Sequence, residues 1–142
     1  MRFAVDGILV KEGKIALIQR GGRTFHNFWA LPGGMLEEGE MVETTLAREM
    51  KEELGVEVTA QEILGVYSEK NRDPRQHTIS VVFICGYSGR MVAGDDAKSC
   101  KEFSLEEALQ LELAFDHKKI LEDYKKWLEK KETFWSSKQK VI

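Results

Sequence analysis

The chain has 142 residues, of which 42% are hydrophobic and 32% are charged, as expected for one ordinary globular domain. Its formal net charge of −3 gives none of the overall positive field by which many proteins bind nucleic acids. The N-terminal segment lacks a signal-peptide pattern, and no apolar run approaches the roughly 20 residues that span a bilayer. We therefore expect a cytoplasmic protein that binds neither nucleic acid nor membrane.

The first half of the chain predicts a β-hairpin, a further extended segment and a helix. Residues 3–10 and 14–20 are short β-type runs that a Lys-Glu-Gly turn separates. Residues 28–34, FWALPGG, form an extended segment that ends in Pro-Gly-Gly, a strong break in regular structure. Across residues 42–54 apolar side chains recur every four positions, which predicts a helix with one buried stripe, and Gly55 suits the position just past its end. The stripe consists of Val42, Leu46, Met50 and Leu54.

The second half predicts two more strands and two more helices. Residues 62–69 and 77–88 are strand-like, and residues 90–104 form a loop that leads to a strand or turn. Residues 104–111 begin with a Ser-x-x-Glu capping signature and predict a short helix, whereas residues 116–132 predict a long amphipathic helix. Because strands precede and follow the first helix, we expect a single α/β or α+β domain in which helices pack against a sheet.

Three glutamates crowd the C-terminal half of the first predicted helix. Glu49, Glu52 and Glu53 lie near the negative end of the helix macrodipole and repel one another across one turn, at a cost of about 0.2–0.5 kcal/mol per pair. At about 100° per residue the three side chains share one side of the helix, beside the buried stripe. Carboxylate oxygens grouped in this way suit Mg²⁺ or Mn²⁺, whose charge turns the repulsion into attraction. A solvated acidic face is the alternative interpretation.

The segment from Gly34 to Val56 resembles the sequence box of the Nudix hydrolase family. The family pattern is Gly, five residues, Glu, seven residues, then Arg-Glu-aliphatic-x-Glu-Glu-x-Gly-aliphatic; the one soft departure is Met50, where the family usually has Ile, Leu or Val. The resemblance implies an α/β/α sandwich with a mixed sheet over residues 1–135. Residues 136–142 are expected to form a flexible C-terminal tail. The other matching positions are Gly34, Glu40, Arg48, Glu49, Glu52, Glu53, Gly55 and Val56.

This resemblance implies metal-assisted hydrolysis of a nucleoside diphosphate linked to another group, with Mg²⁺ or Mn²⁺ as the cofactor. By position, Glu49, Glu52 and Glu53 are the expected metal ligands, and the Gly34 carbonyl completes the site. In an alternative assignment Glu52 or Glu53 acts on the attacking water. Arg48 is expected to pair with a neighbouring carboxylate and orient it; an ordinary surface ion pair is the alternative.

Further acidic positions in the chain have roles that the resemblance implies. Glu40 is expected to hold the loop and the helix together. Asp95, Asp96 and Glu102 lie in the region from which some family members supply a further metal ligand or a catalytic base, and we favour Asp96 for this role. A plain turn is the alternative interpretation of the Gly-Asp-Asp sequence.

The sequence of residues 67–83 bears on which substrate the protein acts on. Their Asp-Pro-Arg-x-His-Thr sequence, followed by a strand, resembles the archaeal and bacterial ADP-ribose pyrophosphatases of the family, which also tend to carry a proline where Pro74 lies, eighteen residues beyond Val56. The resemblance implies hydrolysis of ADP-ribose to AMP and ribose 5-phosphate. The alternatives are a nucleoside triphosphate pyrophosphohydrolase of the same fold and a module that senses ADP-ribose without cleaving it.

Five side chains are candidates for substrate contacts. Arg20, Arg72 and Arg75 carry guanidinium groups that suit phosphate oxygens, with a solvated loop as the alternative for the last two. His77 is expected to stack on or hydrogen-bond to a ribose or base, and a structural role at a strand edge is the alternative. Trp29 is a candidate for stacking on adenine, with core packing as the alternative.

The expected partners are a small nucleotide substrate and a second copy of the chain. Proteins of the family are often dimers, which the resemblance extends to this chain. The apolar FWAL segment at residues 28–31, or the region around Trp127 and Trp135, is the expected interface.

Overall fold

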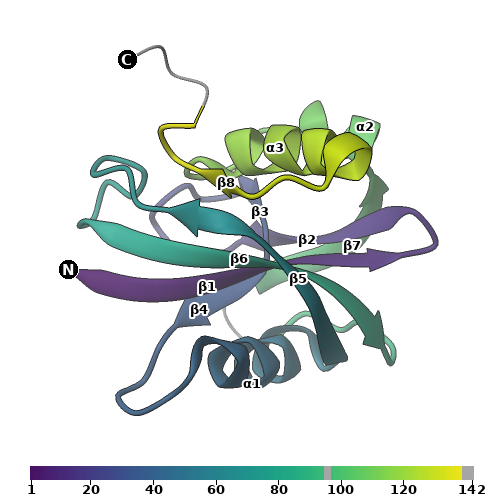
Figure 1. The fold of residues 1–142 in the computed structure, drawn as a ribbon. Helices are drawn as coiled ribbons and strands as arrows, with labels where there is room; N and C mark the ends of the chain where they lie inside the picture. The colour runs from purple at the N-terminus through teal and green to yellow at the C-terminus, as the bar shows by residue number, and fades with distance from the viewer. Residues whose placement is uncertain (95–96, 139–142) are drawn as a thin grey trace.

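The computed structural model describes residues 1–94 and 97–138, in which a mixed β-sheet lies between α1 on one face and α2 with α3 on the other (Figure 1). The mixed-sheet α/β/α sandwich predicted from the sequence is therefore confirmed. The strands and helices are β1 (Arg2–Lys11), β2 (Lys14–Arg20), β3 (Trp29–Ala30), β4 (Gly33–Met35), α1 (Val42–Leu54), β5 (Glu57–Tyr67), β6 (Thr78–Ser88), β7 (Ala97–Ser104), α2 (Leu105–Leu109), α3 (His117–Lys130) and β8 (Phe134–Trp135).

The first strand is the organising element of the sheet. The order of neighbouring strands is β3-β2-β1-β6-β5-β8, with β4 added to β1 and β7 added to β2. Strand β1 pairs antiparallel with β2 and β4 and parallel with β6, so it has three partners along its length. Because β1 is covered on both faces, its sequence is a nearly continuous apolar run rather than an alternation.

Two hydrophobic clusters fill the two faces of the sheet. Ile8 of β1 belongs to the cluster that packs against α2 and α3, whereas its neighbour Leu9 belongs to the cluster that packs against α1. This division follows from the two-residue period of a strand. The α1 stripe is as predicted for Leu46, Met50 and Leu54, which are buried, while Val42 is partly buried.

The helix ends illustrate how local sequence positions the elements. Gly55 ends α1 with a left-handed φ of 68°, and its N–H donates to the Lys51 carbonyl at 2.9 Å. Ser104 and Glu107 form the predicted capping box of α2, in which each accepts a hydrogen bond from the backbone N–H of the other. No helix in residues 1–94 and 97–138 is both long and apolar enough to cross a membrane.

Strand pairing lengthens or creates three strands relative to the sequence expectations. Strand β5 begins at Glu57 rather than at residue 62, because β6 pairs with it along its whole length across two irregularities. Strand β7 forms where a loop leading to a strand or turn was expected, and β8 was not expected at all. Strand β8 lies so close to Gly65 that a Cβ there would collide with the Phe134 carbonyl.

The two segments proposed as dimer interfaces differ in exposure. Ala30 and Leu31 of the FWAL segment are buried, so little of that segment is available to a partner. The Trp135 side chain is 48% exposed. Ser136, in the segment expected to be a tail, accepts hydrogen bonds at its Oγ from the backbone of Ser68 and Glu69; residues 139–142 lie outside the described residues.

A buried tyrosine–carboxylate pair joins the sheet to α3. The Tyr67 hydroxyl donates to Asp123 Oδ2 at 2.8 Å, and Lys119 donates to the same oxygen at 3.2 Å. Tyr67 and Asp123 are 0% and 2% exposed. A buried carboxylate needs such partners, because removing them leaves its charge poorly solvated.

We expect Tyr67→Phe to lower the free energy of unfolding by about 1–3 kcal/mol, because the substitution deletes a hydrogen bond to a buried charge. Urea denaturation followed by circular dichroism measures the change. Tyr124→Phe is the matched control, since no hydrogen bond of its hydroxyl is found within the described residues, and we expect it to cost far less. Equal losses in the two variants would contradict this account of the pair.

Candidate active site

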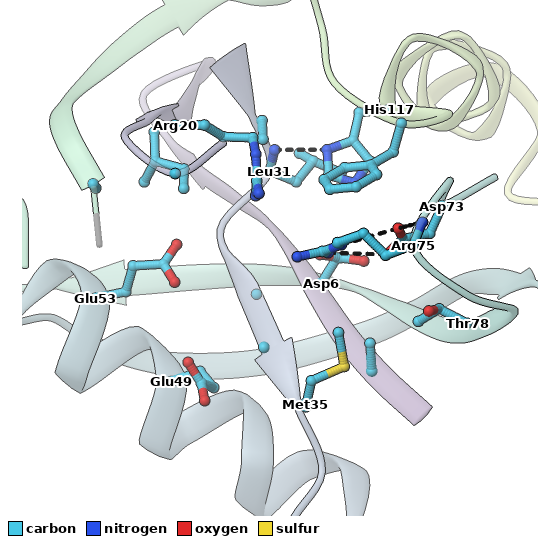
Figure 2. A pocket seen from close by; sticks show the side chains of 18 of the residues that line it. Asp6, Arg20, Leu31, Met35, Glu49, Glu53, Asp73, Arg75, Thr78 and His117 are labelled. Atoms are coloured by element: carbon cyan, nitrogen blue, oxygen red, sulfur yellow. Dashed lines mark hydrogen bonds and ion pairs between the residues drawn. The ribbon is translucent and has the colours of Figure 1, made fainter. Parts of the chain in front are cut away.

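A polar cavity of about 760 Å³ opens beside β4, between α1 and the N-terminus of α3 (Figure 2). Its lining comes from β1, β2, β3, β4, β6, β7, α1, the loop between β5 and β6, and the start of α3. Acidic and basic side chains both reach it. The charged, histidine and threonine residues of the lining are Asp6, Arg20, Glu49, Glu53, Arg72, Asp73, Arg75, Thr78, Lys98 and His117.

The acidic end of the cavity is built by α1 and β4. Glu49 and Glu53 lie one helical turn apart and both line the cavity, facing the strand that carries Gly34 (Figure 2). A Cβ on Gly34 would overlap the Glu49 carboxylate. The absence of a side chain at Gly34 therefore lets the carboxylate lie directly against the backbone of β4.

Arg48 holds this end together. Its guanidinium donates two hydrogen bonds of 2.9 Å to the Glu40 carboxylate, one of 2.8 Å to Glu49 and one of 3.1 Å to the Met35 carbonyl. Glu40 Oε1 also accepts from Thr45 Oγ1 at 2.8 Å. The arginine side chain is 24% exposed, so these contacts form at the edge of the packed structure rather than in open solvent. Arg48 thus links the loop before α1, strand β4 and the Glu49 carboxylate.

The charges of this network shift one another's ionisation. The bidentate hydrogen bond from Arg48 lowers the pKa of Glu40 to about 2, and the Glu37 backbone N–H contributes in the same direction. The same pairing raises the pKa of Arg48. Burial raises the pKa of Glu49, and the Arg48 contact opposes that rise. Burial therefore disfavours the charged form of Glu49 despite its contact with Arg48.

The third glutamate of the predicted cluster lies outside the cavity. Glu52 is 62% exposed, and its carboxylate contacts Arg48 at 3.4 Å. Within the described residues, no three His, Cys, Asp or Glu side chains are gathered closely enough to hold a metal ion. Two carboxylates, Glu49 and Glu53, and the Gly34 backbone nevertheless offer the oxygen donors that Mg²⁺ or Mn²⁺ prefers. These oxygen donors are of the kind that suits a hard divalent cation.

Two arginines form the basic end of the cavity. The guanidinium carbons of Arg20 and Arg75 lie 4.9 and 5.5 Å from the centre of the Phe115 ring. Asp73 fixes Arg75 with two side-chain hydrogen bonds of 3.0 and 2.9 Å, and Arg20 Nε donates to the Thr24 carbonyl at 2.8 Å. Burial and the nearby Arg75 charge lower the pKa of Arg20. An anion in the cavity would relieve the repulsion between these two cations.

Arg72 lines the cavity but is already paired. Its guanidinium donates to both Asp116 oxygens, at 2.9 and 2.8 Å, and to the Thr78 carbonyl at 3.3 Å. Burial by itself lowers the pKa of Arg72, and the Asp116 carboxylate more than offsets this, so that the net shift is upward. Asp116 is the N-cap of α3, yet its side chain caps no helix N–H, because both of its oxygens bind Arg72.

Several charged or polar cavity residues were not predicted as site residues from the sequence, and two of them, His117 and Asp6, are buried with one hydrogen-bonding atom left over among the described residues. His117, 3% exposed, accepts a hydrogen bond at Nδ1 from the Leu31 backbone N–H at 3.0 Å, and burial lowers its pKa. Asp6, 9% exposed, accepts a hydrogen bond from Ser80 Oγ at 2.5 Å. A charged residue within the apolar run FAVDGILV was a signal for Asp6, since carboxylates are rarely buried without a role. His117 lies in a helix start that carried no such signal.

The structure brings together only part of the predicted substrate contacts. Arg20, Arg72 and Arg75 line the cavity. His77, which immediately precedes β6, does not line the cavity. Its Nε2 lies 2.9 Å from the Ser68 carbonyl, just after the end of β5. Trp29 packs edge-on against Phe103 in the core, with ring centres 5.0 Å apart.

Two further expectations concern the exposure of the loop between β5 and β6 and the role of the Asp95–Asp96 pair. The solvated-loop alternative is wrong for Arg72, which is buried, whereas the Arg75 side chain is 39% exposed. Asp95 and Asp96, proposed as a further ligand or base, lie outside the described residues.

A family profile described as the NUDIX domain matches residues 1–124. The chain belongs to the Nudix family. The family was inferred from the box at residues 34–56, and this inference is confirmed, as is the family's α/β fold. Nudix proteins typically depend on divalent metal ions, in agreement with the oxygen donors at the acidic end of the cavity.

Three relatives illustrate the range of similar Nudix proteins. An ADP-ribose pyrophosphatase of Methanocaldococcus jannaschii is 50% identical over 125 residues, which cover 87% of this chain and 73% of that protein. The NUDIX domain of Shewanella oneidensis NrtR, solved with ADP-ribose, has a TM-score of 0.78 and 27% identity over 90% of this chain and 88% of that one. A bifunctional NMN adenylyltransferase/ADP-ribose pyrophosphatase of Francisella tularensis, solved with AMP and a manganese ion, has a TM-score of 0.77 and 27% identity over 90% of this chain and 41% of that one.

The lowered pKa of Glu40 predicts a pH-dependent contribution to stability. Because the folded-state pKa of about 2 lies below the ordinary value of 4.5, the Glu40–Arg48 pair stabilises the fold fully above pH 4.5. This contribution is lost as the pH falls toward 2. We expect Glu40→Gln to lower the urea midpoint at pH 6 and 7, and the difference from the native chain to shrink between pH 4.5 and 3. Glu38→Gln, at an exposed position of the same loop, is the control; a difference for Glu40→Gln that is constant from pH 3 to 7 would contradict the assignment.

We expect Gly34→Ala to displace the Glu49 carboxylate and weaken Mn²⁺ binding by about 10- to 100-fold, the range found when metal ligands are disoriented. Electron paramagnetic resonance of free Mn²⁺ during a titration measures this affinity. Gly86→Ala is the matched control, because its added Cβ meets only the flexible end of Gln61, at 3.0 Å. Unchanged affinity in a folded Gly34→Ala variant would place the cation elsewhere.

Proposed function

We propose that this Nudix protein hydrolyses the pyrophosphate bond of ADP-ribose, with Mg²⁺ or Mn²⁺ as the cofactor, to give AMP and ribose 5-phosphate. The observation that carries the proposal is the 50% identity to an ADP-ribose pyrophosphatase over 87% of the chain. The relative solved with ADP-ribose supports the same ligand, and the one solved with AMP and manganese supports the product and the kind of metal.

The cavity suits this substrate in size and in charge. Its volume of about 760 Å³ lies within the range of small-molecule sites. Carboxylates line one end, and Arg20 and Arg75 line another, so that a bound pyrophosphate meets cations on both sides once metal occupies the acidic end. This division explains how a chain of net charge −3 accommodates a dianionic substrate.

The acidic end is proposed to hold the metal and to act on the water. Glu49, Glu53 and the Gly34 carbonyl would bind the cation, and Glu52 would turn inward from its present contact with Arg48. A bound divalent ion lowers the pKa of a water molecule and neutralises charge on the pyrophosphate oxygens. Arg48 would keep the Glu49 carboxylate in place through the 2.8 Å hydrogen bond.

The reaction exchanges one phosphorus–oxygen bond for another. The water oxygen bonds to one phosphorus, the bond from that phosphorus to the bridging oxygen breaks, and each product keeps one phosphate. A carboxylate takes the proton of the water. Glu52, Glu53 and Asp96 are the proposed candidates for this base. Arg20 and Arg75 would hold the phosphate oxygens that face away from the metal.

The first test is a product assay with Mg²⁺ and a panel of ADP-ribose, NADH, diadenosine polyphosphates and nucleoside triphosphates, oxidised ones included. We expect the highest kcat/KM for ADP-ribose, with AMP and ribose 5-phosphate as products. Glu53→Gln is expected to lower kcat by at least about 100-fold, because it removes the charge of a proposed metal ligand and candidate base. Glu57→Gln is the matched control, since Glu57 is exposed and pairs only weakly with Lys51 at 3.2 Å, and we expect native rates.

Other outcomes would replace the proposal. A preferred triphosphate that yields a monophosphate and pyrophosphate would keep the metal site and assign a nucleotide-pool function. Tight binding of ADP-ribose without turnover of any substrate would make the protein a sensor. Native rates for Glu53→Gln would remove that glutamate from the catalytic site.

A further inference from the structure

Asp6 is a buried carboxylate at the floor of the cavity. It occupies the middle of β1, is 9% exposed and lines the cavity. Ser80 of β6 donates to its Oδ2 at 2.5 Å, and the other oxygen stands over Gly33, where a Cβ would collide with Oδ1. No side-chain donor to Oδ1 is found within the described residues. The carboxylate therefore presents one acceptor oxygen to whatever occupies the cavity.

His117 presents a donor to the same cavity. The Leu31 N–H donates to Nδ1, so Nδ1 carries no proton and Nε2 carries the proton of the neutral ring. Burial favours this neutral form by lowering the pKa of His117, against the opposing effect of the Asp6 charge. Within the described residues no hydrogen-bond partner of Nε2 is found. One acceptor and one donor, both more than nine-tenths buried, thus remain for a ligand (Figure 2).

The register of β4 locates Asp6 relative to the proposed reaction site. Val5 pairs with Gly34 and Asp6 pairs with Gly33, so Asp6 is one residue along the strand from the partner of the proposed metal-binding carbonyl. Paired Cα atoms lie about 4.5–5.5 Å apart and neighbouring residues about 3.3 Å apart along a strand. These spacings put the Cα atoms of Asp6 and Gly34 about 6–7 Å apart, so that a ligand whose phosphate lies at Gly34 can reach Asp6 with the adjoining sugar.

We propose that Asp6 and His117 form a subsite that binds the hydroxyl groups of one of the two riboses that flank the pyrophosphate. A hydroxyl donates to the carboxylate and accepts from the imidazole, so a vicinal diol satisfies both groups at once. The subsite deepens the proposed function and rests on it. A deoxy analogue leaves a buried charged acceptor unsatisfied, and sites of this kind reject such analogues strongly.

An adenine edge offers the same pairing of donor and acceptor, and ADP-ribose contains two riboses. The short path from Gly34 to Asp6 favours a sugar, because the base lies beyond the sugar from the phosphorus. Three analogues distinguish the two riboses and the base as occupants of the subsite. They are ADP-ribose with one hydroxyl removed from the terminal ribose, ADP-ribose with 2′-deoxyadenosine, and the counterpart with hypoxanthine in place of adenine.

The experiment measures kcat/KM of the native chain, Asp6→Asn and His117→Asn for ADP-ribose and the three analogues. Asparagine at position 6 replaces an acceptor by an amide, and asparagine at position 117 keeps an acceptor for the Leu31 N–H while removing the Nε2 donor. We expect the native chain to prefer ADP-ribose to one deoxy analogue by about 10- to 100-fold. Each variant is expected to lose that preference, to within about threefold, by losing activity only on the fully hydroxylated substrate.

Asp123→Asn is the matched control, because Asp123 is also buried but binds Tyr67 and Lys119 away from the cavity. It should lower stability and leave the preference for hydroxylated substrate intact. Discrimination only against the hypoxanthine analogue, lost in the variants, would overturn the sugar assignment in favour of the base.

Two further results separate the subsite from the proposed function. Asp6→Asn with equal losses on all substrates and a raised Mg²⁺ requirement would place Asp6 at the metal and overturn the subsite. Native hydrolysis of ADP-ribose with unchanged discrimination in both variants would overturn the subsite while leaving the proposed function standing. A native chain that cleaves no ADP-ribose would instead remove the function on which the subsite rests.

Discussion

The close approach of β4 to its neighbours is the constraint on which the site depends. Gly33 and Gly34 are consecutive, and successive positions on a strand face opposite sides. A Cβ on the first would meet Asp6 of β1, and a Cβ on the second would meet Glu49 of α1. Two missing side chains therefore allow two carboxylates to lie against one short strand. Because both side chains are missing, the proposed metal site at Glu49 and the proposed sugar subsite at Asp6 can flank the same strand.

Three consecutive residues before and at the start of α3 close the cavity on its other side. Phe115 contacts Arg20 and Arg75, Asp116 binds Arg72, and His117 accepts from the Leu31 backbone. These contacts form at the expense of favourable local conformation and helix capping in the segment. Phe115 has a left-handed φ of 55°, which costs a residue other than glycine about 1–3 kcal/mol, and the Asp116 carboxylate caps no helix N–H.

The fully buried and the partly buried charges of the cavity are compensated differently. Arg72 and Asp73 are buried and fully paired by protein groups, as buried charges must be. Glu49, whose pKa burial raises, and Arg20, whose pKa burial lowers, are the partly buried charges that the protein compensates incompletely. Groups of this kind mark binding sites more often than structural ones, because a ligand of opposite charge completes them. The electrostatics thus agree with a ligand that carries a metal at one end and phosphate oxygens at the other.

Local patterns in the sequence determined most of the secondary structure. The four-residue period of α1, the glycine at its end and the capping box of α2 depend on neighbours within one turn, and all three formed as expected. The box at residues 34–56 likewise identified the family, because its residues are close in sequence. Strand β8 and the early start of β5 were not predictable, since both depend on pairing with distant strands.

The tertiary structure alone decided which side chains share the cavity. Local patterns cannot tell that Arg72 meets Asp116, 44 positions away, or that His117 meets Leu31, 86 positions away. They equally cannot tell that Trp29 faces the core or that Glu52 faces solvent, since each orientation depends on what packs opposite. The sequence by itself determined the family and the acidic helix; the packing of distant strands around Gly33 and Gly34 decided the cavity, because contacts between remote residues leave no local periodicity.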